Sequence, residues 1–310
     1  MSKDFGKGAV LMGGSSAERE ISLISGAAVL DALKTAGVEA LAFDPAAQPV
    51  WNLHELNVMR VFNILHGGAG EDGTIQGALD MMKIPYTGSG VLGSALAMDK
   101  IRTKWMWQSA GIPTPKSRRV VSADEGPQLV AALGLPLIVK PVREGSSIGL
   151  TKVMRAEEFA DAFAAARTLA DGRIEEVMAE TFVSGTELTA AVLNGKALPL
   201  VRIEAPEGRY DYQNKYFTDA VKYHCPSGLS AAQEAEIGQT VLRAFDALGC
   251  RGWGRADLIL QSDGSYSLLE MNTNPGMTGH SLVPMAARAS GIEFGDLVLQ
   301  ILAGARYGQG

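Results

Sequence analysis

Hydrophobic and polar positions along the first third of the chain alternate between strand-like and helix-like patterns. Ile21, Ile24 and Ala28 share one face of a predicted helix, and residues 73–82 predict another. Short apolar runs between and around these helices predict four β-strands, at residues 9–12, 38–43, 61–65 and 84–86. This βαβ order predicts a small parallel sheet.

The segment 111–115 contains one glycine and two prolines, and it is expected to close a helix that begins near Val91. A second unit then begins, with predicted strands at 135–141, 150–154 and 177–182 and a helix at 156–170. The remainder predicts strands at 187–193 and 198–203, a polar loop at 205–224, a helix at 230–248, a hairpin and C-terminal helices.

The predicted hairpin near the end of the chain carries polar residues on one face. With Asp263 and Gly264 as a two-residue turn, Asp257 lies opposite Glu270 and Arg255 lies opposite Asn272. Side chains alternate along a strand, so all four point to the same side. The other side carries a core pattern: Ala256, Leu258 and Leu260 against Leu269 and Met271.

Two carboxylates in opposite positions repel each other unless a cation lies between them. With the amide of Asn272 alongside, the oxygen ligands suit Mg²⁺ or Mn²⁺ better than zinc. The alternative is a solvated outer face of a hairpin, on which acidic residues are common.

Two glycine loops are candidates for phosphate binding. Lys140 ends an apolar strand, and the polar loop 143–149 follows it with Ser146 and Ser147, which suits contact with phosphate oxygens. The alternative is an ordinary turn. Residues 88–93 match G-x-G-x-x-G, the pattern of a dinucleotide-binding loop. The acidic residue that such a site needs about 20 positions later is missing, so we interpret residues 88–93 as a strand-to-helix turn.

Glu18 has two interpretations. Residues 15–18 match a helix capping box, in which Ser15 caps the helix and Glu18 reaches back to its backbone. In the functional interpretation, Glu18 lies at the mouth of the first strand–helix loop, where such sheets bind ligands, and faces a substrate ammonium group. His66 follows another strand and lines the same mouth, or it only orders its own turn.

Composition narrows the class of protein. The 310 residues, of which 46% are hydrophobic and 20% charged, predict an ordinary globular chain of two or three domains. The net charge of -6 argues against a broad nucleic-acid footprint. Two cysteines, no signal-peptide pattern and no apolar run of membrane-spanning length predict a cytoplasmic protein with reduced thiols.

Seven segments together resemble the D-alanine–D-alanine ligases of the ATP-grasp superfamily, and they occur in family order along nearly the whole chain. They are GGSSAEREISLISG (13–26), HGGAGEDGTIQG (66–77), YTGSGVLGSALAMDK (86–100), VKPVREGSSIG (139–149), NKYFTD (214–219), GCRGWGRADL (249–258) and LLEMNTNPGMTGHSLVP (268–284). The resemblance implies an α/β fold of three domains: a Rossmann-like N-terminal domain (1–98) with a parallel sheet, and two ATP-grasp subdomains (99–183 and 184–310) with ATP between them.

The resemblance also implies roles for single residues. ATP would contact Lys100, Lys140, Ser147 and Lys215 through its phosphates, Glu180 and Val183 through adenine, and Glu187 through ribose. Two Mg²⁺ or Mn²⁺ ions would be held by Asp257, Glu270 and Asn272. The first D-alanine would bind Glu18, which links to Ser146 and Tyr216, and the second would bind Ser281 near His66. Arg255 and the amide of Gly276 would form an oxyanion hole.

The implied activity is ATP-dependent synthesis of D-alanyl-D-alanine for peptidoglycan precursors, by a homodimer. The nearest alternative is a ligase that joins D-alanine to D-lactate, and Tyr216 favours the dipeptide. The chain departs from the family pattern at Val142, where a serine is usual, at Gly68 and Ala69, and at Thr181, where many relatives have a lysine.

Overall fold

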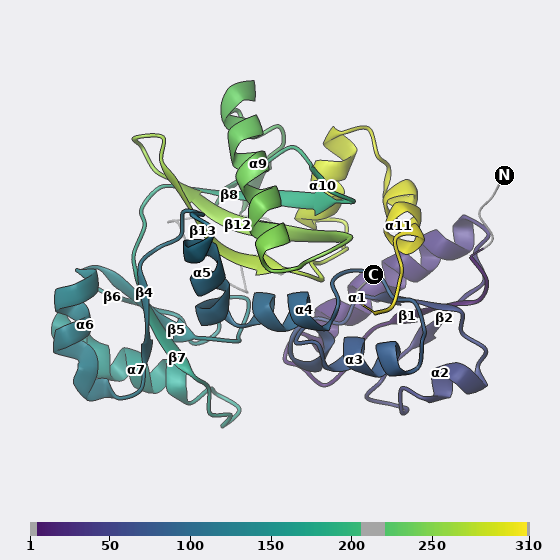
Figure 1. Cartoon of the computed structure of the whole chain (residues 1–310), viewed down its shortest axis with the longest axis horizontal. Coiled ribbons are helices and arrows are strands. Elements are labelled where there is room, and N and C mark those ends of the chain that lie inside the picture. Colours follow the sequence, from purple (N-terminus) through teal and green to yellow (C-terminus); the bar gives the residue numbers. More distant parts are fainter. Residues whose placement is uncertain (1–4, 206–220, 309–310) are drawn as a thin grey trace.

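The computed structural model describes residues 5–205 and 221–308. They form three sheets with helices packed on them (Figure 1). The N-terminal sheet with its helices lies at one end of the molecule and the four-stranded sheet lies at the other, while the largest sheet lies between and above them in this view. Within these ranges, no helix combines the length and the apolar character needed to cross a membrane.

The N-terminal sheet is parallel, as predicted, with strand order β2-β1-β3. Its elements are β1 (Gly8–Leu11), α1 (Arg19–Thr35), β2 (Ala40–Phe43), α2 (Asn52–Glu55), β3 (Arg60–Asn63) and α3 (Thr74–Met81). The strand predicted at 84–86 is wrong, because Tyr86 forms only isolated bridges, with Val61 and Arg306. The buried face of α1 also differs from the prediction: Ile24 is 49% exposed, whereas Ser22 and Ser25 are fully buried.

The helix predicted from Val91 to the glycine–proline segment is two helices, α4 (Val91–Met98) and α5 (Lys100–Ser109). Asp99 interrupts them with an extended backbone, and its side chain accepts a hydrogen bond from the amide of Arg102 at 3.0 Å. Aspartate favours capping over a helix interior because its short side chain competes for nearby backbone amides. Gly88–Gly93 do form a turn into a helix, since α4 begins after Gly90.

The four-stranded sheet is antiparallel, in the order β4-β7-β5-β6. Its elements are β4 (Ser117–Val120), α6 (Gly126–Leu133), β5 (Leu137–Pro141), β6 (Thr151–Val153), α7 (Phe159–Arg167) and β7 (Val177–Thr181). The three predicted strands are confirmed, and β4 is one that the sequence analysis missed. A hydrophobic cluster of its own, between this sheet and α6 and α7, holds this part together.

The largest sheet contains the predicted hairpin. Its elements are β8 (Thr186–Leu193), β9 (Lys196–Ala197), β10 (Val201–Glu204), β11 (Lys222–His224), β12 (Trp253–Leu260) and β13 (Tyr266–Asn272), with α9 (Ala231–Ala247), α10 (Leu282–Ala289) and α11 (Phe294–Ala303). Part of the predicted loop 205–224 is therefore strand β11, which pairs with β10. Residues 206–220 lie outside the described residues.

The two-residue turn of this sheet is not the one that was predicted. Asn194 and Gly195, both at positive φ, connect β8 to β9, with Leu193 paired to Lys196. Asn-Gly favours this turn because both residues tolerate the left-handed conformation. Asp263 and Gly264 instead belong to a three-residue loop, closed by a hydrogen bond from the Gln261 amide to the Ser265 carbonyl at 2.8 Å.

One hydrophobic core joins the N-terminal sheet to the largest sheet. Val10 and Phe62 of the small sheet share a buried cluster with Trp253 of β12 and with the apolar faces of α10 and α11. The rings of Phe62 and Trp253 lie 6.2 Å apart at a tilt of 55°. Because side chains from both sheets fill this core, the loops of the N-terminal sheet are held against the polar end of β12 and β13.

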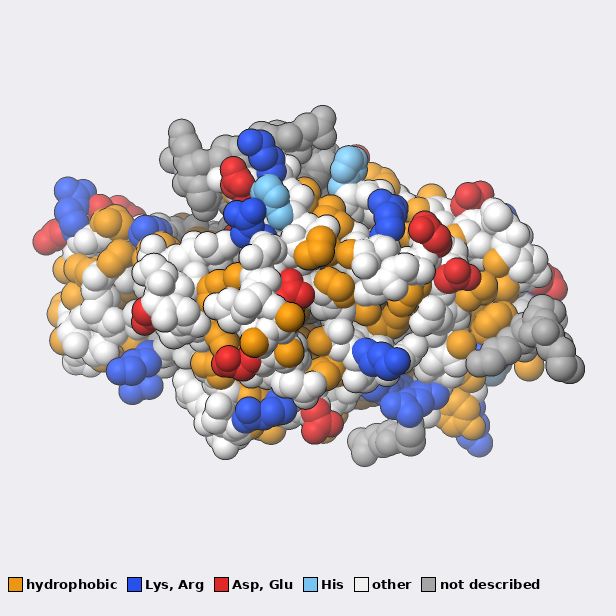
Figure 2. All heavy atoms as spheres, turned by 90° about the horizontal axis from the view of Figure 1, so that it is seen from above, with side chains coloured by type: hydrophobic (Ala, Val, Ile, Leu, Met, Phe, Trp, Pro, Cys, Tyr) orange, Lys and Arg blue, Asp and Glu red, His pale blue; other side chains and the backbone are white. Residues whose placement is uncertain are grey.

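Charged side chains of both signs are interspersed with apolar and neutral groups on the face in Figure 2. This distribution suits the modest net charge of the chain.

Helix α4 approaches the loop at Gly249 and Cys250 closely at Gly93. A β-carbon at Gly93 would lie 2.7 Å from the carbonyl oxygen of Gly249, whereas one at Gly77 in α3 would meet only Val91 at 3.8 Å. Alanine in a helix is ordinarily more stable than glycine by about 1 kcal/mol. We expect Gly77→Ala to raise the melting temperature slightly and Gly93→Ala to lower it. Equal effects would show that the approach at Gly93 relaxes at no cost.

Candidate active site

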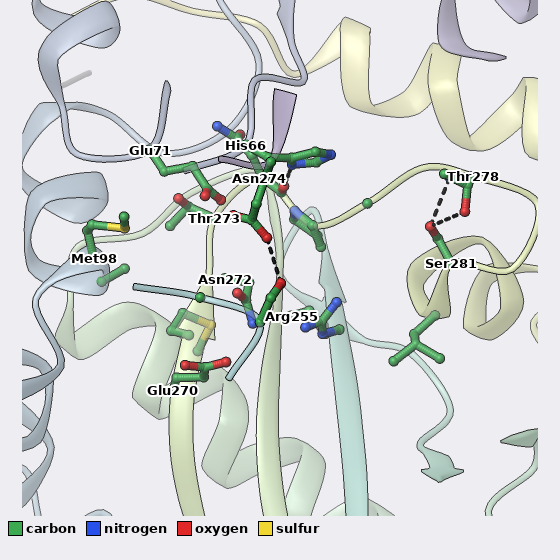
Figure 3. Close-up of a pocket in the computed structure, with 18 of the residues that line it drawn as sticks. His66, Glu71, Met98, Arg255, Glu270, Asn272, Thr273, Asn274, Thr278 and Ser281 are labelled. Atoms are coloured by element: carbon green, nitrogen blue, oxygen red, sulfur yellow. Dashed lines mark hydrogen bonds between the residues drawn. The ribbon is translucent and has the colours of Figure 1, made fainter. Parts of the chain in front are cut away.

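A polar cavity lies where loops of the N-terminal sheet meet the ends of β12 and β13 (Figure 3). Glu18, His66 and Glu71 line it from the N-terminal part, and Gly145 and Ser146 line it from the loop after β5. The remaining walls include Met98 at the end of α4, Lys100 at the start of α5, three polar residues of the hairpin (Arg255, Glu270 and Asn272), and residues between Thr273 and Leu282. Most of the predicted site residues are thus brought together from three distant parts of the chain.

The hairpin places its four polar residues as predicted. Arg255 pairs with Asn272, and Asp257 pairs with Glu270. The register is correct although the turn is not, because a bulge between Asp257 and Leu258 offsets the extra loop residue. Beyond the bulge, Leu258 pairs with Leu268, so the buried residue is Leu268 and the prediction of Leu269 is wrong.

Cations neutralise both carboxylates of the hairpin. Arg255 donates from Nε and Nη2 to the two oxygens of Asp257 at 2.7 and 2.8 Å, and the amide of Asn272 donates to Asp257 Oδ2 at 3.2 Å. Lys100 Nζ lies 3.2 Å from Glu270 Oε2 and donates to the carbonyl of Glu144 at 2.8 Å. Two carboxylates and an amide oxygen on one face are a suitable ligand set for a hard divalent cation.

A second charged cluster, whose members do not line this cavity, lies between α5 and the four-stranded sheet. Glu180 is 3% exposed and lies between two lysines: Lys140 at 2.5 Å from Oε1 and Lys104 at 2.8 Å from Oε2. Burial acts to raise the pKa of Glu180, but the charges of Lys104 and Lys140 outweigh it and lower the pKa to about 2. Burial lowers the pKa of Lys104 to about 8. The sequence analysis missed Lys104.

Two positions that depart from the family pattern have contacts that explain their side chains. Val142 is fully buried and packs with Ile101 and Met178 in a small hydrophobic cluster. Thr181 donates from Oγ1 to the Leu133 carbonyl at 3.1 Å.

Two further predicted ATP-binding residues lie near the end of the four-stranded sheet and in the largest sheet. Val183 is half-buried just after β7, and Glu187 lies in β8 opposite Ile203 and Ile259.

The capping box predicted for Glu18 is wrong. Helix α1 begins after Glu18 with no side-chain cap, and the carboxylate accepts a hydrogen bond from Ser146 Oγ at 2.7 Å. Ser146 and Ser147 have φ values of 52° and 62°, a left-handed conformation that is uncommon for residues other than glycine. The hydrogen bond links the N-terminal part to the loop after β5. Lys215 and Tyr216 lie outside the described residues.

His66 is 6% exposed and is held by hydrogen bonds on both sides of its ring. Nδ1 lies 2.9 Å from the carbonyl oxygen of Asn274, which can only accept, so Nδ1 carries the proton. Nε2 then accepts from Ser25 Oγ at 3.4 Å, and that oxygen accepts from the amide of Met277 at 3.2 Å. Burial lowers the pKa of His66, in keeping with this neutral form.

This chain of hydrogen bonds positions the segment that contains Gly276. Asn274 also donates from its side chain to the carbonyl of Gly70 at 3.0 Å, so both its backbone and its side chain contact the N-terminal part. Ser281 Oγ accepts from the amide of Thr278 at 2.8 Å. A β-carbon at Gly276 would lie 2.9 Å from Ser281 Oγ, so a side chain at this position would crowd Ser281.

The class of protein follows from the comparisons with known proteins. The family model described as D-ala D-ala ligase C-terminus matches residues 106–303, and the model described as D-ala D-ala ligase N-terminus matches residues 52–89. The fold is the ATP-grasp fold of these ligases. The structure of a D-alanine–D-alanine ligase from Bacillus anthracis aligns with a TM-score of 0.82 at 31% identity, covering 96% of both chains.

Sequence comparison identifies the family. The D-alanine–D-alanine ligase of Azoarcus sp. (strain BH72) is 59% identical over 309 residues, covering 99% of this chain and 100% of the relative. That of Aromatoleum aromaticum is 57% identical over 304 residues, covering 98% and 97%. This chain belongs to the D-alanine–D-alanine ligase family.

Glu71, which the sequence analysis did not single out, lines the cavity and has a raised pKa. Its Oε2 accepts from the Gly67 amide at 2.6 Å, and burial together with the charge of Glu18 raises its pKa from an ordinary 4.5 to about 8. Between these two pH values the folded protein holds a proton that the unfolded chain has lost. The stability from Glu71 is therefore full below about pH 4.5 and is lost as the pH rises towards 8.

We expect Glu71→Gln to raise the melting temperature relative to the wild type at pH 8.5, with a smaller gain at pH 5, because the amide never ionises. Glu20→Gln, at an exposed position of α1, controls for the loss of one negative charge. A gain of the same size at both pH values would contradict a protonated Glu71.

Proposed function

We propose that this chain uses ATP to join two D-alanine molecules into D-alanyl-D-alanine through an acyl phosphate, and so supplies peptidoglycan precursors. The observation that carries the proposal is the convergence of Glu18, Ser146, His66 and Arg255 on one cavity. The relatives of 57% and 59% identity, which are named for this reaction, support it. A homodimer, a cytoplasmic location and the domain boundaries after residues 98 and 183 stay predictions.

ATP would lie between the two antiparallel sheets, with its phosphates reaching the cavity. Lys100, Lys140, Lys215 and the Ser147 loop would bind the phosphates, Glu180 and Val183 would meet adenine, and Glu187 would meet ribose. The buried ion pair of Lys140 and Glu180 supports this placement, because Glu180 lies near the end of β7, just before the segment that leads to Val183 and Glu187. A B. anthracis ligase described as complexed with ATP has the same fold, with a TM-score of 0.79 at 28% identity over 96% of both chains.

Asp257, Glu270 and Asn272 would hold two Mg²⁺ or Mn²⁺ ions. Their paired positions on one face of the hairpin fit such ions. When bound, divalent cations neutralise the charge of the triphosphate. Arg255 and Lys100 already form ion pairs with Asp257 and Glu270. Binding of the divalent cations would therefore rearrange these ion pairs.

In the first step, Glu18 would bind the ammonium group of one D-alanine. A carboxylate oxygen of this D-alanine would attack the γ-phosphorus, the bond from phosphorus to the ADP oxygen would break, and the acyl phosphate of D-alanine would form. Lys215 and Lys100 would counter the charge of the transferred group. The hydrogen bond from Ser146 orients Glu18 for its role, since it fixes one of the two carboxylate oxygens.

In the second step, Ser281 would bind the carboxylate of the other D-alanine, near His66. The amine attacks the acyl carbon, and the tetrahedral intermediate expels phosphate to leave the peptide bond. Arg255 and the amide of Gly276 would stabilise the negative oxygen of this intermediate. Asp257 fixes the plane of the Arg255 guanidinium with two hydrogen bonds, so the donor is oriented before reaction.

The function is tested by measuring phosphate release from ATP and Mg²⁺ with D-alanine, L-alanine, or D-alanine plus D-lactate, with products identified by mass. We expect release that depends on D-alanine, with D-alanyl-D-alanine as the product. Product formed only with D-lactate or another acceptor would transfer the proposal to a different ligase reaction. A folded, ATP-binding chain that releases no phosphate with any of them would contradict it.

Arg255→Ala tests the oxyanion role separately from metal binding. Loss of one oxyanion donor costs about 10²–10³-fold in kcat. The variant also leaves Asp257 without its cation, which should favour a divalent ion at Asp257. We therefore expect a large fall in kcat with no increase in the Mg²⁺ concentration needed for half-maximal rate. Near-normal kcat in the folded variant would refute the role of Arg255.

A further inference from the structure

Lys104 is a fully buried lysine that the proposed reaction does not use. It lies in α5, and its side chain has 0% exposure. Burying an ammonium group costs several kcal/mol unless it is paired and hydrogen-bonded. A lysine at such a position therefore indicates a specific partner, and Glu180 is that partner at 2.8 Å.

The contacts of Lys104 connect the two antiparallel sheets. Its Nζ donates to Thr114 Oγ1 at 2.8 Å, and Thr114 Oγ1 donates to the carbonyl of Leu268 in β13 at 2.8 Å. Glu180 belongs to β7 in the other sheet. The side chain of Lys104 is thus fixed from both sides.

The two lysines that pair with Glu180 differ in how tightly their side chains are held. Lys140 is the last residue but one of β5, shortly before the glycine loop, and is 7% exposed. The proposed function assigns it to the ATP phosphates. Lys104 is enclosed and tethered through Thr114. If Lys140 turns to the phosphates, Lys104 is the cation that stays with Glu180.

We propose that Lys104 is a positioning residue that keeps Glu180 ionised and oriented as a hydrogen-bond acceptor for the 6-amino group of adenine while Lys140 serves the phosphates. The inference rests on the proposed function, because it takes Glu180 as the residue that meets adenine. It extends that function by assigning the choice of nucleobase to a residue that does not itself touch the nucleotide.

Adenine and hypoxanthine differ in the hydrogen-bonding group at position 6, so the preference between them reports on the ionisation of Glu180. Adenine donates from its 6-amino group, whereas hypoxanthine has an acceptor oxygen at the same position. An ionised carboxylate can only accept, so it favours adenine. Without Lys104, Glu180 would become a buried acid that is protonated or turned away once Lys140 leaves, and a protonated carboxyl can donate to hypoxanthine.

The test compares ATP with inosine triphosphate in D-alanine-dependent phosphate release, with Mg²⁺ present. Base preference is defined as kcat/KM for ATP divided by kcat/KM for inosine triphosphate. We expect Lys104→Met to lower the base preference about 10-fold or more through a higher KM for ATP, as expected for a lost charge-assisted contact, with kcat at saturating ATP little changed. Lys116→Met, at an exposed position two residues from Thr114, should keep the wild-type preference.

A double-mutant comparison shows whether Lys104 acts through Glu180. Glu180→Gln should lose base preference to a similar extent, because an amide can both donate and accept. The double variant K104M/E180Q should lose little more than either single variant. Thr114→Val, which frees the lysine but keeps the shape of its neighbour, should give a smaller loss. It provides the test if Lys104→Met does not fold.

The outcomes separate the inference from the function on which it rests. A wild-type chain with no D-alanine-dependent phosphate release would contradict the proposed function. With that activity present, the inference is overturned if the wild type does not discriminate between the two nucleotides. It is also overturned if K104M and T114V keep the wild-type preference, or if the losses in K104M and E180Q add in full.

Discussion

Charge balance in and beside a partly buried cavity is the constraint on which this structure depends. Asp257 is neutralised by Arg255 and Glu270 by Lys100, while Glu180 lies between Lys104 and Lys140. Glu71 remains protonated near neutral pH because Glu18 is close and burial disfavours its charge. Buried charges are tolerated only when they are paired. Under the proposed function, Lys100 and Lys140 would also meet the triphosphate, so stability and proposed function would share one set of contacts.

The shared core determines where these charges meet. Because Phe62 packs against Trp253, the loops of the N-terminal sheet are fixed relative to the hairpin. Asn274 then contacts His66 with its backbone and Gly70 with its side chain, which aligns the segment before Gly276. The loop after β5 belongs to a sheet with a separate core, and it reaches the cavity through the bond between Ser146 and Glu18. This bond and the one from Lys100 to the Glu144 carbonyl hold the loop at the cavity.

The sequence predicted most strands and the polar face of the hairpin, because period-two alternation shows directly which residues share a side. It failed where local signals competed. Asp263 and Gly264 resembled a tight turn, but the two-residue turn is at Asn194 and Gly195. Ser25 and Lys104 could not be recognised, because a polar residue on a helix reads as exposed until the packing is known. The hairpin register itself suggested a metal site, and the position of Glu18 suggested an ammonium partner. The identities of the substrates and most other single-residue roles came from the family resemblance, since no spacing along the chain encodes which substrate a carboxylate meets.

The central claim is that this chain activates the carboxylate of an amino acid by transferring the γ-phosphoryl group of ATP to it. An acyl phosphate intermediate requires an oxygen atom to move from D-alanine to phosphate. The most direct measurement is therefore turnover of D-alanine labelled with ¹⁸O in its carboxylate, followed by mass analysis of the released phosphate. The account predicts one ¹⁸O atom in each phosphate released for each dipeptide formed. Dipeptide formation with unlabelled phosphate would contradict it.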